Sequence, residues 1–151
     1  MIAITKALAA EHAMYRVLFD HIEELLPKLR RPAEVKRLAR LVEDLLRSHA
    51  VAEEDLVLVA LDHESAHQRR ADRLHRDHQE IDSRLTRVHG INNLSQARSL
   101  LEAAIVASRA HFKHEERVVF PLIEKVTKPE TLVKLGAVWM QRRHLPANWA
   151  V

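Results

Sequence analysis

Apolar residues recur along most of the chain at alternating steps of three and four residues, the period of one face of an α-helix. Four long segments follow this pattern, and the stripe of each segment contains a single histidine. The stripes are Ile4, Leu8, His12, Tyr15, Phe19, Ile22 and Leu26; Val35, Leu38, Val42, Leu45, His49, Ala52, Leu56 and Val59; Leu74, His78, Ile81, Leu85 and Val88; and Ala97, Leu101, Ala104, Ser108, His111, Glu115, Val118 and Leu122. The pattern predicts four amphipathic helices whose buried faces each carry one imidazole.

Turn-forming residues separate these four segments. Pro27 and Pro32 bracket the first turn, and Gly90 stands between the third segment and the fourth. The apolar periodicity lapses between the second and third segments. We place that junction within residues 62–66, with continuation of the second helix past His63 as the alternative. The expected fold is all-α, an up-down-up-down four-helix bundle followed by a short fifth helix.

The length and composition agree with a single helical domain. We expect one domain over the 151 residues, with the bundle at about residues 3–126 and the C-terminal helix at about residues 129–145. Hydrophobic residues make up 47% of the chain and charged residues 30%, the balance typical of amphipathic helices. Cysteine is absent, which excludes thiolate ligands, so any metal site must use nitrogen and oxygen donors.

The charge and hydropathy patterns exclude two kinds of partner. Lys and Arg number 24 against 21 Asp and Glu, the excess is scattered, and aromatic residues amount to only 4%, which argues against nucleic-acid binding. No uncharged apolar stretch reaches 18 residues, and the first residues lack the pattern of a signal peptide. We therefore expect a cytoplasmic protein that does not bind membranes.

The four stripe histidines are expected at one height in the bundle. Antiparallel neighbours meet when two residues are equidistant from the turn that joins their helices. The midpoint of His12 and His49 is 30.5, that of His49 and His78 is 63.5, and that of His78 and His111 is 94.5. Each midpoint falls in or beside a predicted turn, so the four imidazoles should converge in the core.

Two glutamates extend this cluster. Glu53 follows His49 by four residues and Glu115 follows His111 by four, one helical turn along the same face. A carboxylate in an apolar core is costly unless it is paired or bound to a cation. The repeated module indicates two metal ions, with positions left for a bridging oxygen species and an exogenous ligand. Such nitrogen and carboxylate donors suit iron, manganese and zinc alike.

The order His, His-x-x-x-Glu, His, His-x-x-x-Glu resembles the HHE cation-binding domain of the hemerythrin-like family. The resemblance covers about residues 8–126; residues 111–121 are especially similar to the family's form, and Glu11-His12 resembles its opening. It implies a carboxylate-bridged pair of iron ions, with an oxo or hydroxo bridge, that meets O2, peroxide or nitric oxide. By this matching, one iron is bound by His12 and His49, the other by His78 and His111, and the bridges are Glu53 and Glu115.

The sequence departs from the oxygen-carrying members of that family. They have a further histidine four residues before the third-helix ligand, where this chain has Leu74, and their second bridge is an Asp five residues after the last histidine. His75, one position off the stripe, is the candidate replacement for the missing ligand. Without a replacement both irons keep open positions, which favours redox or sensing chemistry over reversible oxygen carriage.

Three further residues have two interpretations each. Tyr15 either lines the pocket as a hydrogen-bond donor or ligand, or packs in the core, and its apolar stripe favours packing. Glu54 and Glu116 each follow a proposed bridging glutamate. They either orient imidazoles from outside the ligand set or lie on the surface.

Three classes of function are compatible with the pattern. The first is a non-haem di-iron protein that binds or reduces a small oxidant, as a sensor or detoxifier; as an enzyme it would be an O2- or peroxide-reducing oxidoreductase. The second is an iron-binding, storage or iron-sensing module that acts through a protein partner. The third is a metal-free helical interaction domain. The carboxylates predicted beside buried histidines favour a metal site, and the first class is our main hypothesis.

Overall fold

The computed structural model describes residues 1–58 and 68–144, and nearly all of them are helical. The long helices are α1 (Ile4–Leu25), α2 (Pro32–Glu53), α4 (Gln68–Gly90) and α5 (Leu94–His114). The shorter elements are the 3-10 turn η1 (Leu26–Lys28), the π-helical turns η2 (Glu54–Leu58) and η3 (Glu115–Val119), and the helices α6 (Phe120–Val126) and α7 (Pro129–Arg142).

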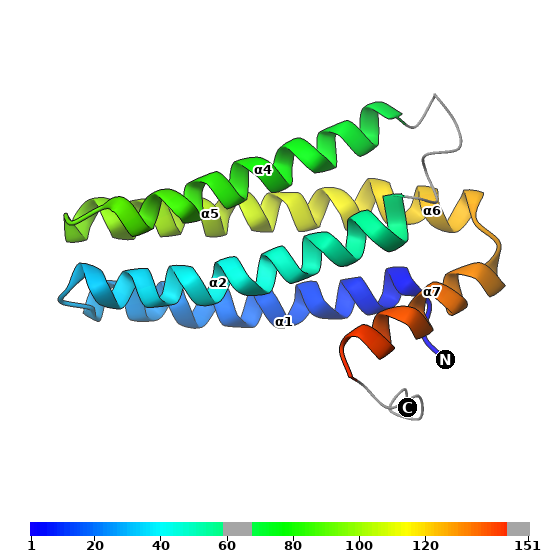
Figure 1. The fold of residues 1–151 in the computed structure, drawn as a ribbon, viewed down its shortest axis with the longest axis horizontal. Helices are drawn as coiled ribbons and strands as arrows, with labels where there is room; N and C mark the ends of the chain where they lie inside the picture. The colour runs from blue at the N-terminus through cyan, green and yellow to red at the C-terminus, as the bar shows by residue number, and fades with distance from the viewer. Residues whose placement is uncertain (59–67, 145–151) are drawn as a thin grey trace.

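The four long helices lie side by side in alternating directions (Figure 1). The α1–α2 and α4–α5 turns lie at one end of the bundle, and α6 and α7 lie at the other. No strand occurs in the described part of the chain, so the predicted all-α four-helix bundle with a further C-terminal helix is confirmed. The predicted junction at residues 62–66 and the stripe position Val59 lie outside the described residues. Among the described helices, none is long and apolar enough to cross a membrane.

The core consists of two apolar clusters, one on each side of a polar layer. One cluster lies toward the interhelical turns and includes Phe19, Leu85 and Leu101. The other lies toward α6 and α7 and includes Leu8 and Leu74. The stripe histidines occupy the level between these clusters, so apolar layers lie above and below them along the bundle.

The π-helical turns change the register of the buried face. A π turn holds one residue more than an α turn, so the positions that follow it rotate around the helix. Within η3 the predicted stripe position Val118 is 39% exposed, whereas Val119 is 1% exposed. Ile123 is fully buried in place of the predicted Leu122. The stripe prediction was therefore wrong by one residue after Glu115, because a strict α-helical period cannot contain the inserted residue.

Helix α7 packs across the start of α1, with Trp139 buried against the bundle end. Its close approach depends on Gly136, which is buried in the face toward the N-terminal segment. A Cβ atom at this position would lie 2.0 Å from the carbonyl oxygen of Ile2. At position 136 only glycine fits this spacing without movement of the backbone.

Replacement of Gly136 by alanine should push α7 away from the N-terminal segment. We expect a loss of about 1–3 kcal/mol in the free energy of unfolding, the usual cost of overpacking. Urea denaturation followed by circular dichroism measures this loss. Gly90→Ala is the control, because its Cβ would meet nothing within 4 Å. Equal stability of the two variants would contradict the close packing of α7.

Candidate metal centre

The structure brings together one histidine from each long helix and two glutamates. His12 lies on α1, His49 on α2, His78 on α4 and His111 on α5. Glu53 is the last residue of α2, and Glu115 is the first residue of η3. Two overlapping groups of these residues could each hold an ion, and both groups contain both glutamates. The groups are His12, His49, Glu53 and Glu115, and Glu53, His78, His111 and Glu115.

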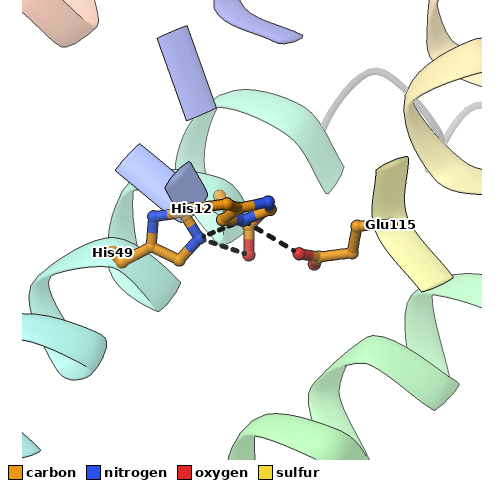
Figure 2. Close-up of side chains that lie close together, drawn as sticks. His12, His49 and Glu115 are labelled. Atoms are coloured by element: carbon orange, nitrogen blue, oxygen red, sulfur yellow. Dashed lines mark hydrogen bonds and ion pairs between the residues drawn. The ribbon is translucent and has the colours of Figure 1, made fainter. Parts of the chain in front are cut away.

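The imidazole Nε2 atoms face one another and the carboxylates at short range. The Nε2 atoms of His12 and His49 are 2.9 Å apart, and those of His78 and His111 are also 2.9 Å apart. Glu115 turns one carboxylate oxygen toward each pair, Oε2 to His12 at 3.3 Å and Oε1 to His111 at 3.0 Å. Figure 2 shows His12, His49 and Glu115 directed toward one another from three elements.

Glu53 occupies the matching place on the other side of the cluster. Its Oε2 atom lies 3.6 Å from Nε2 of His49 and 3.3 Å from Nε2 of His78. This carboxylate therefore also contacts one histidine from each pair. The two glutamates connect the two halves of the cluster.

The spacing of these donor atoms fits a bound metal. An ion with bonds of about 2.1 Å places neighbouring donors about 3.0 Å apart in octahedral geometry and about 3.4 Å apart in tetrahedral geometry. The observed contacts of 2.9 to 3.6 Å cover that range. Glu53 Oε2 and both carboxylate oxygens of Glu115 are buried without a hydrogen-bond partner within the described residues. A cation would compensate these buried carboxylates, which are otherwise costly.

The second nitrogen of each imidazole contacts a carboxylate on a neighbouring element. Nδ1 of His12 is 2.9 Å from Glu116, and Nδ1 of His49 is 2.8 Å from Glu11. With Nε2 turned to the cluster, each Nδ1 donates its hydrogen outward and fixes the ring orientation and tautomer. The remaining two pairs repeat the pattern around the bundle: His78 with Glu54 at 3.2 Å, and His111 with Asp77 at 3.4 Å.

Comparison with known protein families agrees with this arrangement. The family model described as the hemerythrin HHE cation binding domain matches residues 3–123. The chain belongs to this family. No curated protein and no solved structure gave a significant match. Membership of the hemerythrin HHE family makes the chain a cation-binding domain, and the histidine–glutamate cluster is the part of the structure that fits this property.

The four carboxylates that contact the Nδ1 atoms of the cluster histidines are called the outer carboxylates below. The sequence had identified two of the four as candidates. Glu54 and Glu116 contact imidazoles, so the surface interpretation of these two residues does not hold. The roles of Glu11 and Asp77 were missed. Each immediately precedes a stripe histidine but contacts the histidine of the next helix. The usable signal was the acidic residue before the lone histidine of the first and third stripes.

The structure does not bring His75 into the HHE cluster. Its Nδ1 is 3.3 Å from Glu54 and its Nε2 is 2.9 Å from Gln79, and its side chain is 56% exposed. The proposed replacement of the missing ligand is therefore not seen, because the one-residue offset from the stripe turns the ring toward the surface. Leu74 is buried where the oxygen carriers have their extra histidine.

Tyr15 is a core residue that borders the cluster. It is 2% exposed, and its hydroxyl donates to the carbonyl oxygen of Leu45 at 3.4 Å. Its ring meets the ring of His49 edge-on, with centroids 5.5 Å apart. Burial raises the pKa of Tyr15 above its ordinary value, and the charge of Glu11 adds to this effect. Tyr15 lies outside both candidate ligand groups, in agreement with the packing interpretation.

The electrostatics of the HHE cluster favour charged carboxylates. Burial by itself would raise the pKa of Glu53, but His49 and His78 hold it well below its usual range. Burial would likewise lower the pKa of His78, whereas its contacts with Glu53 and Glu54 and the charge of Glu115 raise it to about 9. Glu53 thus remains an anionic donor at neutral pH, and a metal ion must displace a proton from His78 to use its nitrogen.

A cavity gives access to the cluster from the side of the bundle. It lies between α2 and α4, has a volume of about 240 Å³, and reaches the imidazoles of His49, His78 and His111. His12 does not line it. The HHE cluster therefore has a closed side at His12 and an open side lined by His49, His78 and His111.

Proposed function

We propose that this HHE domain is a non-haem di-iron protein that binds or reduces a small oxidant (O2, peroxide or nitric oxide) as a sensor or detoxifier. The observation that carries the proposal is the small donor set. Each candidate ligand group supplies two imidazole nitrogens and two carboxylates. Iron commonly takes up to six donors, so four protein ligands leave positions for small molecules.

The residues of the chain have separable tasks in this proposal. His12 and His49 hold one ion, His78 and His111 hold the other, and the two glutamates bridge them. The outer carboxylates keep each Nδ1 protonated, so that Nε2 remains free for the metal. The apolar clusters on both sides of the polar layer limit the access of water. The proposed cofactor, two iron ions with an oxo or hydroxo bridge, would supply the electron transfer when bound.

Elemental analysis combined with spectroscopy tests this function. Protein purified without chelator and reconstituted anaerobically with ferrous ion should contain about two irons per chain, as the paired donor groups require. Addition of O2, peroxide or nitric oxide in separate experiments should change its visible spectrum. His111→Ala, loaded and measured in the same way, should lose iron and most of the response.

Two results would redirect the proposal. Two bound irons with no response to any of the three oxidants would favour an iron-binding, storage or iron-sensing module that acts through a partner. Failure to retain iron after reconstitution would contradict a di-iron centre. Retention of manganese or zinc alone would identify a different metalloprotein.

A further inference from the structure

The cavity between α2 and α4 is larger than a diatomic oxidant requires. Its volume of about 240 Å³ compares with roughly 30 Å³ per molecule in liquid water. An apolar cavity of about 150 Å³ is known to accept benzene. The space beside the cluster therefore fits one six-membered ring with a substituent.

The lining of this cavity separates an apolar body from two polar ends. Leu46, Ile81, Leu85 and Phe112 form an apolar wall, and all four side chains are buried in the bundle core. The imidazoles of His49, His78 and His111 form one polar end. The outer end carries polar side chains such as Gln79. A ligand with an apolar ring and one hydroxyl group matches this order, because its hydroxyl can face an imidazole or the metal position while its ring lies on the apolar wall.

The charges at the outer end select against anions. Glu43, Asp82 and Arg47 lie in the outer part of the lining, whereas Glu54, which also lines the cavity, contacts His78 at the imidazole end. The guanidinium of Arg47 is already engaged, 3.0 Å from Glu43 and 2.9 Å from Asp82. At this acidic edge an anionic ligand would meet carboxylates and an arginine that is already paired with two of them.

We propose that the α2–α4 cavity binds a neutral monocyclic aromatic molecule of the phenol class. The ring packs against Leu46, Ile81, Leu85 and Phe112, and the hydroxyl is directed toward the open side of the cluster. The orientation of the hydroxyl rests on the proposed metal site, whereas binding of the ring rests on the cavity alone. The cavity is thus a binding site for an organic molecule beside the position of the small oxidant.

Calorimetric titration with phenol tests this site in the full-length, metal-loaded protein. Saturable binding of one phenol per chain is expected. Ala50→Phe, which fills the cavity from α2, should weaken phenol binding at least tenfold. Ala110→Phe is the matched control, because Ala110 lines a separate hollow between α4 and α5 that also touches His111. This control should stay within twofold of the wild type.

Metal content and melting temperature, measured on the same samples, separate the two proposals. Phenol binding by protein that retains no iron would support the cavity and contradict the di-iron function. Iron retention without saturable phenol binding would overturn the cavity proposal alone. Phenol affinity in Ala50→Phe equal to the wild type would also overturn it. If Ala50→Phe fails to fold, Val51→Trp on the same cavity wall replaces it, with the same tenfold loss expected.

Discussion

Replacement of Glu115 by glutamine should cost the proposed di-iron centre at least one of its metal ions. Glu115 belongs to both candidate ligand groups, and each of its carboxylate oxygens faces a different imidazole pair. Glutamine keeps the size of the side chain but removes the charge and one acceptor oxygen. Loss of a residue that only orients a ligand already reduces metal affinity about 10–100-fold, so loss of this shared donor should exceed about 100-fold.

Iron content per chain and the melting temperature with and without added ferrous ion measure this effect. Each hundredfold loss of affinity removes about 2.7 kcal/mol of metal-dependent stabilisation when the metal is in excess. Glu102→Gln is the control, because Glu102 is exposed on α5, the helix that leads into η3. Two ions bound by Glu115→Gln with unchanged affinity would exclude Glu115 as a bridge.

Replacement of Glu11 by alanine should destabilise the fold and weaken the metal site together. Glu11 accepts hydrogen bonds from Trp139 at 3.3 Å and from Arg143 at 2.7 Å, and it lies 2.8 Å from Nδ1 of His49. Burial raises the pKa of Glu11, but His49 and Arg143 reverse this effect and keep the pKa below its usual value. Removal of a buried charged partner of this kind costs about 3 kcal/mol.

Urea denaturation of the metal-free protein and metal titration of the folded protein measure the two effects separately. We expect the stability loss in the first experiment and a loss of about 10–100-fold in metal affinity in the second, because His49 loses its orienting carboxylate. Arg143→Ala is informative beside it, since this variant leaves the Glu11–His49 contact in place. Wild-type metal affinity in the Glu11→Ala protein would show that Glu11, with its hydrogen bond from Trp139 on α7, stabilises the fold without supporting the metal site. Glu102→Ala provides the surface control.

The bundle and the convergence of the six cluster residues could be predicted from periodicity and turn positions alone. His12, His49 and His111 lie on apolar stripes, and equal distances from the turns determine which residues meet. Such reasoning succeeds because an α-helix keeps a fixed period and short turns force antiparallel neighbours into register.

The remaining details depend on departures from that fixed period. Val118 was assigned to the buried face, yet the π-helical turn η3 shifts the register within its own span and buries Val119 instead. The contact of Asp77 with His111 crosses between helices. A stripe analysis describes one helix at a time and cannot show such a contact.

The contribution of α7 was also beyond reach of the sequence pattern. The family model ends at residue 123, and α7 begins at Pro129. Trp139 is buried at the end of the bundle. Its hydrogen bond to Glu11 links this helix to the candidate centre through one intervening carboxylate. Sequence periodicity indicates that a helix packs somewhere, but it does not identify the residue that an indole N–H will meet.

Neither helical hairpin carries a complete ligand group. The pair formed by α1 and α2 supplies His12, His49 and Glu53, and its ligand group needs Glu115 from the other half of the chain. The other half supplies His78, His111 and Glu115, and its ligand group needs Glu53 from α2. Each bound ion would therefore have ligands from both hairpins and would link them. Parting of the hairpins would break both ligand groups at once, so bound metal would stabilise the bundle against this opening.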